Sequence, residues 1–499
     1  MVDRAHAEEF LRRLPQDDPF RMLEEITFWL KALRDAYGML PLRSFEVLDL
    51  LDQTATTHRR HLTAEFVAMG SRYRKFQAQR IWNTSFQYAR ELGATYQHLL
   101  AQYRKSIIGA DLLRPMLPII VARAIRALHL ELKWSLLRHG PVDQLLWQLA
   151  GELFSYAEEN RFATESVKVY PGDQKASSVQ SEYLQTLMLG ISATDGLVPE
   201  YADLVDEFIR TYAEHFALER TPRPGCHYYV SLGSAKAPAR LIQRVAASSA
   251  IRYFGPDAAV AMVDRTMDSI NDRGMVPPEV NPGGMFKAAA ILHVLDHLAL
   301  HWGSSPPIRS SERTAALMRI SVVHDFDSIL SMVSGESLEL DFNSSVEVWN
   351  VENESEGGFG AVITETVSDW LEIGSLLGIR MEEGATWGVG LVRRLHSPAE
   401  GVINVGIRYL SRGVVKVELT GVAAGASGAD VNALVLLSSD EGSAQKGELS
   451  VMLPSGTFTA DQSFTMRRLQ RTYTLLPRKL LESGTGYELT RFLVRRSEI

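Results

Sequence analysis

A short Ser- and Pro-rich stretch at residues 303–309 divides the sequence into two parts of different character. Proline fixes its own φ angle and has no backbone N–H, so this stretch cannot continue a helix and indicates a linker. Before the linker the hydrophobic pattern is typical of helices, and after it the pattern is typical of short strands. We therefore predict a multidomain protein, with an all-α region over residues 1–303 followed by β-rich domains.

The first region repeats one helical pattern along most of its length. Leu23, Ile26 and Leu30 recur at spacings of three and four, which places them on one face of a helix. The same pattern extends to residues 237–253, which we also predict to be helical. Helices in series pack as bundles or as stacked pairs, and both arrangements remain open for this region. A cluster of turn residues near position 170 marks a candidate break within it.

The second region consists of short runs rich in Val, Ile and aromatic residues, punctuated by Gly, Pro and Ser. Such runs are typical of a small antiparallel β-barrel, which we assign with its N-terminal arm to residues 304–420. Residues 421–430 are rich in Gly and Ala and are predicted to form a second joint. Further strand-like runs follow, and we assign residues 421–499 to a second small β module.

Composition and charge exclude several classes of protein. The chain has 499 residues and a formal net charge of -8, which argues against a general nucleic-acid binder because no overall basic field would attract phosphates. Cys226 is the one cysteine, so no intrachain disulfide can form and a reducing compartment is expected. No window has the roughly 18 uncharged apolar residues that a membrane-spanning helix needs. We predict a cytoplasmic protein without a transmembrane segment.

The common signatures of catalysis are missing from the sequence. It contains no G-x-x-x-x-G-K-[ST] phosphate loop, no G-x-S-x-G nucleophile elbow and no C-x-x-C metal pair. The chain therefore gives no positive indication of an enzyme, and we predict that it is not one.

Three histidines on one predicted helix are the best candidates for a metal site. His293, His297 and His301 lie at positions i, i+4 and i+8. The first two could chelate a divalent cation because side chains four residues apart share a helix face. The third lies a further turn away, and no H-E-x-x-H pattern supplies a hydrolytic base. We expect these histidines to serve helix packing, and we predict no metal and no cofactor.

Two short motifs in the second region carry groups that suit a polar ligand. Asn353, Ser355 and Gly358 form an N-x-S-x-x-G turn between strand-like segments, which presents a carboxamide, a hydroxyl and bare backbone N–H groups. Arg309 and Arg313 form an R-x-x-x-R pair directly after the linker. Guanidinium groups can pair with phosphate oxygens and stack on bases.

Together these motifs resemble the two signatures of PilZ domains, which are bacterial receptors for cyclic di-GMP. The resemblance lies in the C-terminal third only, covers about a fifth of the chain and does not reach the helical region. It implies a PilZ-like barrel that binds cyclic di-GMP through Arg309, Arg313, Asn353, Ser355 and Gly358. The carboxamide and the hydroxyl would then hydrogen-bond a guanine edge, while glycine allows close backbone approach.

Two functions are compatible with these observations. The first is a cytoplasmic signalling adaptor, whose barrel senses cyclic di-GMP and whose helical region relays the change to a protein partner. The alternative is a helical scaffold whose PilZ-like barrel no longer binds nucleotide. The acidic residues of the arm and the turn favour the alternative because they would repel phosphates; they are Glu312, Glu352, Glu354 and Glu356.

Overall fold

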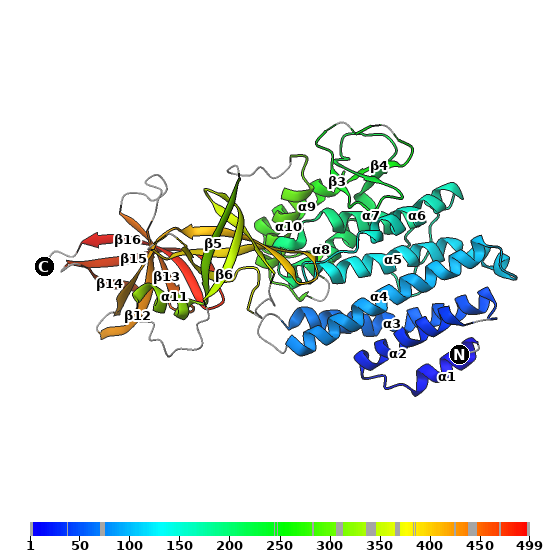
Figure 1. Ribbon diagram of the computed structural model, residues 1–499, viewed down its shortest axis with the longest axis horizontal. Coiled ribbons are helices and arrows are strands. Elements are labelled where there is room, and N and C mark those ends of the chain that lie inside the picture. Colours follow the sequence, from blue (N-terminus) through cyan, green and yellow to red (C-terminus); the bar gives the residue numbers. More distant parts are fainter. Residues whose placement is uncertain are drawn as a thin grey trace. The chain divides into compact units, whose positions relative to one another are not determined.

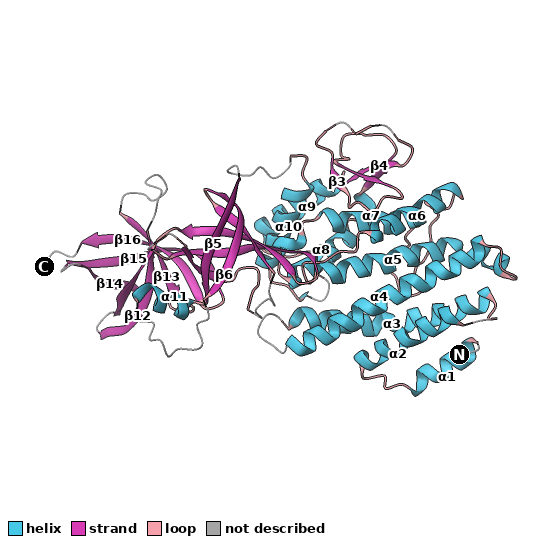
Figure 2. Ribbon diagram, viewed as in Figure 1, coloured by secondary structure: helices cyan, strands magenta, loops and turns pink. Residues whose placement is uncertain are grey.

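The computed structural model describes residues 3–36, 38–69, 75–243, 245–246, 248–281, 284–305, 313–335, 346–364, 370–382, 384, 386–423, 426–437, 447–468 and 471–496. The chain forms two compact units, Met1–Ile308 and Arg309–Ile499. Helices dominate the first unit and strands the second (Figures 1 and 2). The predicted multidomain class, a helical region followed by a small antiparallel β-barrel and a further β module, is confirmed.

The first unit is built from long helices joined by short turns. Its α-helices are α1 (Arg4–Arg13), α2 (Pro19–Asp35), α3 (Pro41–Ala68), α4 (Lys75–Arg104), α5 (Leu117–Leu136), α6 (Leu145–Glu159), α7 (Val179–Ile191), α8 (Pro199–Thr211), α9 (Ala259–Arg273) and α10 (Ala288–Trp302). Several begin at a side-chain cap; Ser178, for example, accepts a hydrogen bond from the Ser181 backbone N–H at the start of α7. Among the described helices, none is both long enough and apolar enough to cross a lipid bilayer.

One hydrophobic core runs through the first unit, from Ala7 on α1 to Trp302 on α10. The turn near residue 170 lies within this core, because Tyr170 is buried. Its hydroxyl donates to Asp52 on α3 over 2.9 Å. Asp52 is also buried and accepts further hydrogen bonds from Tyr88 and Tyr96 on α4. The turn near residue 170 therefore joins the surrounding helices and does not separate two cores.

A small sheet interrupts the helices and overturns one sequence-based prediction. Its strands β1 (Ala217–Glu219), β2 (Tyr228–Ser231), β3 (Ala239–Arg240) and β4 (Ile251–Gly255) are ordered β1-β4-β2-β3. Residues 237–253, predicted as helix, instead hold β3 and most of β4, so that prediction was wrong. The cause is that β4 is buried on both faces: Phe254 joins the main core, whereas Tyr253 joins a second cluster. A strand buried on both sides loses its alternating pattern and can be mistaken for a helix.

Helix α5 lies beside α4 (Figure 1) and carries basic side chains into the interior. Three of them donate to carboxylates of three different helices over 2.7 Å: Arg123 to Asp49 on α3, Arg126 to Glu182 on α7, and Lys133 to Asp206 on α8. Removing one member of a buried ion pair is strongly destabilising, because the partner charge stays buried without compensation. These pairs therefore fix both the rotation of α5 about its own axis and its position along that axis.

A substitution at Asp206 tests whether the ion pairs hold α5 in place. Burial alone would raise the pKa of Asp206, but Lys133, Arg210 and His129 together hold it well below its ordinary value. The ionised carboxylate therefore stabilises the fold above its unfolded-state pKa of about 4, and this contribution is lost as the pH falls through the folded-state pKa. We expect Asp206→Asn to lower the free energy of unfolding at neutral pH by about 3 kcal/mol. Denaturant unfolding followed by circular dichroism measures this, and the difference from the wild type should shrink below about pH 4.

The matched control is Glu214→Gln, because Glu214 pairs with Lys175 at 3.0 Å and its side chain is 68% exposed. Such a surface pair contributes less than about 1 kcal/mol. If Asp206→Asn unfolds at the same denaturant concentration as Glu214→Gln, the buried pairs do not hold α5 in place.

The second unit contains two closed six-stranded antiparallel barrels. The first barrel has the order β10-β7-β6-β5-β8-β9. Its strands are β5 (Thr314–His324), β6 (Glu347–Ser355), β7 (Gly358–Ile363), β8 (Leu376–Met381), β9 (Gly388–Ala399) and β10 (Val402–Ser411), and α11 (Phe326–Ser334) follows β5. The predicted small antiparallel barrel is therefore confirmed.

The second barrel has the order β11-β12-β13-β16-β15-β14. Its strands are β11 (Val414–Ala423), β12 (Ala426–Leu436), β13 (Glu448–Pro454), β14 (Ser463–Arg468), β15 (Arg471–Gly484) and β16 (Tyr487–Arg496). Residues 421–423 and 426–430, within the stretch predicted as a joint, lie in β11 and β12. The two barrels and α11 share a hydrophobic cluster that includes Ile329, Trp387 and Leu434.

Candidate functional site

The N-x-S-x-x-G motif forms the hairpin between β6 and β7 in the first barrel. Asn353 and Ser355 lie at the end of β6, and Gly358 opens β7 directly opposite Ser355. The Ser355 hydroxyl donates to the Gly358 carbonyl oxygen over 3.0 Å and closes the turn. A Cβ atom at Gly358 would overlap the Ile407 carbonyl oxygen of β10, so the close approach of β10 requires glycine here.

A β-bulge places the Asn353 side chain on the outside of the barrel. Val351 pairs with Ala361 and Asn353 pairs with Gly360, which leaves Glu352 as an extra residue in β6. Side chains alternate between the two faces of a strand, so in a regular strand without the bulge Asn353 would share the inner face with Val351. The bulge instead sets Asn353 beside Gly360 on the outer face.

The Asn353 carboxamide lies against the bare α-carbon of Gly360. A Cβ atom built on Gly360 would lie 2.9 Å from the Asn353 Oδ1 atom and 3.0 Å from Nδ2. Asn353 Oδ1 is buried and has no hydrogen-bond partner among the described residues. A buried acceptor without a donor is unfavourable, which makes Asn353 Oδ1 a candidate contact for a ligand.

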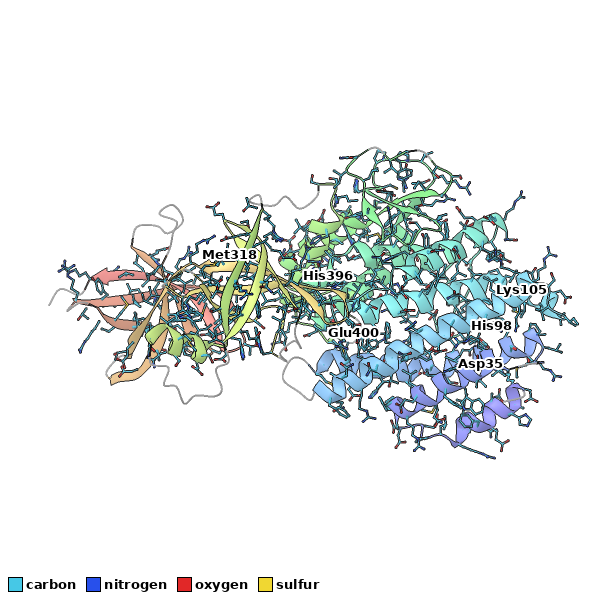
Figure 3. The ribbon with its side chains drawn as sticks, viewed as in Figure 1. Asp35, His98, Lys105, Met318, His396 and Glu400 are labelled. Atoms are coloured by element: carbon cyan, nitrogen blue, oxygen red, sulfur yellow. The ribbon has the colours of Figure 1, made fainter. Side chains whose placement is uncertain are left out.

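Strand pairing aligns Asn353 with one residue on each of three further strands. Asn353 is opposite Gly360, Gly360 is opposite Gly406, and Gly406 is opposite Arg394. We call these four residues the Asn353 row. Because neighbouring strands lie about 4.8 Å apart, the row spans roughly 14 Å, with a carboxamide at one end, a guanidinium at the other and bare glycines between. His396, which is labelled in Figure 3, lies two residues beyond Arg394 on β9. Side chains two residues apart in a strand lie on the same face.

One arginine of the R-x-x-x-R pair, Arg313, directly precedes β5, the strand that pairs with the motif strand β6. Thr314, the first residue of β5, is opposite Glu354 on β6. Continuing this antiparallel register by one residue places Arg313 opposite Ser355, with the Arg313 side chain exposed. Arg309, the other predicted arginine, lies outside the described residues.

The acidic residues of the hairpin are in part neutralised. The Glu354 carboxylate accepts a hydrogen bond from Arg412 over 2.9 Å, and the Arg412 guanidinium also lies 4.4 Å from the centre of the Tyr409 ring. Burial and the Glu354 charge raise the pKa of Tyr409 to about 12, so its hydroxyl stays protonated at neutral pH. Glu352 and Glu356 are exposed, where water screens their charge.

Sequence reasoning missed Gly360, Gly406 and Arg394. A weak signal was present in the alternating G-x-G of Gly358 and Gly360, because glycine inside a strand often marks a close approach. Gly406 and Arg394 lie far from the motif in sequence and reach it only through strand pairing, which no local pattern announces.

The histidines of α10 form no metal site within the described residues. His297 Nε2 is hydrogen-bonded to the Ser192 carbonyl oxygen at 2.8 Å, and its ring packs 4.5 Å from that of His301. No group of three or more His, Cys, Asp or Glu side chains in the described part of the chain is placed to hold a metal ion.

Comparison with known families gives a match in the helical part of the chain. Residues 5–223 match a family model described as the N-terminal domain of the cyclic-di-GMP receptor FimW. This range runs from α1 past β1 and so includes α5 with its buried ion pairs. The match does not extend to the first barrel, where the resemblance to PilZ domains was drawn. No curated protein matches the chain.

The close approach at Gly358 leads to a stability prediction. In Gly358→Ala the added methyl group must displace the β10 backbone, so we expect a loss of about 1–3 kcal/mol in the free energy of unfolding. Gly357→Ala is the control, because a Cβ atom at Gly357 meets nothing within 4 Å. Denaturant unfolding of both variants measures the difference. Equal stability of the two would mean that β10 does not constrain the hairpin.

Proposed function

We propose that this protein is a cyclic di-GMP receptor that binds its ligand on the outer face of the first barrel. In this proposal residues 304–420 are a PilZ-like domain with its arm, residues 421–499 are a second β module, and the helical region 1–303 relays the bound state to a protein partner. The observation that carries the proposal is the buried, unpartnered Asn353 Oδ1 beside the bare α-carbon of Gly360.

The chemistry of the ligand suits these groups. The guanine edge presents N–H donors, which an unpartnered carboxamide oxygen can accept. The flat face of the base can lie along the Asn353 row, where the Asn353 carboxamide borders Gly360 and the Arg394 side chain borders Gly406. Arg313 stands opposite Ser355 by register, and Arg309 precedes it in the arm; both are assigned to the ligand phosphates. Gly358 keeps the hairpin closed against β10.

Two independent similarities support the same ligand. The hairpin and arm resemble PilZ signatures, and the helical residues 5–223 resemble the N-terminal domain of a cyclic-di-GMP receptor. The two lie in different units of the chain. An enzyme finds no comparable support, because the matched family is named as a receptor.

A scaffold that has lost nucleotide binding is the second candidate. It is favoured by the ion pair between Glu354 and Arg412, which can hold the hairpin in place without any ligand. A pull-down separates the two functions. A partner retained equally with and without cyclic di-GMP, and after Arg309→Ala with Arg313→Ala, supports the scaffold.

Calorimetric titration with cyclic di-GMP tests the receptor directly. We expect saturable binding by the full-length protein. Asn353→Ala should weaken it about tenfold or more, since the guanine donor loses its acceptor. Asn432→Ala is the matched control, because Asn432 is an exposed asparagine on β12 of the second barrel. No heat with ligand on the order of tens of micromolar, from folded protein, would remove the receptor proposal.

A further inference from the structure

A carboxylate from the second barrel is held by two arginines of the first. Glu482 on β15 accepts hydrogen bonds from Arg393 on β9 over 2.6 Å and from Arg408 on β10 over 2.7 Å. The Glu482 side chain is 23% exposed, whereas those of Arg393 and Arg408 are 37% and 49% exposed. The two guanidiniums thus share one anion at a position that solvent, and therefore a ligand, can reach.

The position of Arg408 connects this ion pair to the candidate site. Arg408 is opposite Gly358 in the pairing of β7 with β10, and Gly358 is opposite Ser355 in the pairing of β6 with β7. We call Arg313, Ser355, Gly358 and Arg408 the Ser355 row. Two strand spacings, roughly 10 Å, separate Ser355 from Arg408, with only a bare glycine between them. The row carries an arginine at each end.

Arg393 joins Arg408 because of a second β-bulge. Gly406 pairs with Arg394 and Ile407 pairs with Val392, which leaves Arg393 as the extra residue in β9. A bulge redirects the side chain of the extra residue. Here both Arg393 and Arg408 meet Glu482.

We propose that Arg393 and Arg408 form a second phosphate-binding position of the cyclic di-GMP site, and that Glu482 occupies this position in the ligand-free protein. This inference rests on the proposed function. A phosphodiester, like a carboxylate, accepts paired hydrogen bonds from guanidinium groups, so one anion can replace the other on the same donors. Arg313 at one end of the Ser355 row and Arg408 at the other then match a ligand that carries two phosphates.

Displacement of Glu482 links ligand binding to the second barrel. The hydrophobic cluster that the barrels share consists of apolar side chains such as Ile329, Trp387 and Leu434, which make their contacts without the Glu482 carboxylate. What changes is the end of β15, which loses its ionic contact with β9 and β10. A mononucleotide offers one phosphate and cannot engage both ends of the row. The intramolecular carboxylate therefore favours a dinucleotide over single-phosphate competitors.

Titration of full-length variants with cyclic di-GMP tests whether Glu482 competes with a ligand phosphate for Arg393 and Arg408. Glu482→Gln keeps the size of the side chain but removes its charge, so we expect affinity to rise about tenfold, because the phosphate no longer displaces an anion. Glu448→Gln is the control: Glu448 pairs with Arg491 at 3.9 Å within the second barrel, and its substitution should leave affinity unchanged. Arg408→Ala should weaken binding about tenfold.

A double variant tests whether Glu482 lowers the ligand affinity through its contact with Arg408. In an Arg408→Ala background, Glu482→Gln should no longer raise affinity, since the carboxylate acts through Arg408. Thermal unfolding of each variant verifies that it is folded. If the wild type binds and Glu482→Gln binds no tighter than Glu448→Gln, the competition is refuted while the receptor proposal stands. If the folded wild type and all variants fail to bind, both proposals fall together.

Discussion

The candidate site depends on one extra residue in a strand. Glu352 forms a bulge in β6, and the bulge turns Asn353 from the barrel core to its outer face. There the carboxamide meets Gly360, a position where any Cβ atom would crowd it. Every other feature of the site follows from this register: the glycines of the Asn353 row, the arginine at its far end, and the neighbouring Ser355 row. A one-residue slip would send the polar groups inward and the apolar groups outward.

The local motifs of this site could be predicted from sequence, whereas the residues that distant strands contribute to it could not. The N-x-S-x-x-G turn and the preceding arginines lie close together along the chain, so their pattern was visible. Arg394 and Arg408 reach the site only because β9 and β10 close the barrel. In the helical region the apolar stripes predicted most helices. Strand β4 was mistaken for helix because Tyr253 and Phe254 are buried on opposite faces.

The helical unit is held by charge as well as by apolar packing. Buried and partly buried ion pairs from α5 to three other helices fix its arrangement, and sequence alone could not pair these residues because they lie on separate helices. This is the part of the chain that resembles the N-terminal domain of a cyclic-di-GMP receptor. We propose that this unit relays ligand binding on the barrel to a protein partner.

Hydrogen–deuterium exchange with and without cyclic di-GMP tests the location of the site most directly. A ligand lying on the outer face of the first barrel shields the β6–β7 hairpin and the facing part of β10. The account predicts slower exchange in residues 353–360 and 404–410 when ligand is bound. Slower exchange confined to the helical region 1–303, with these strands unchanged, would contradict it.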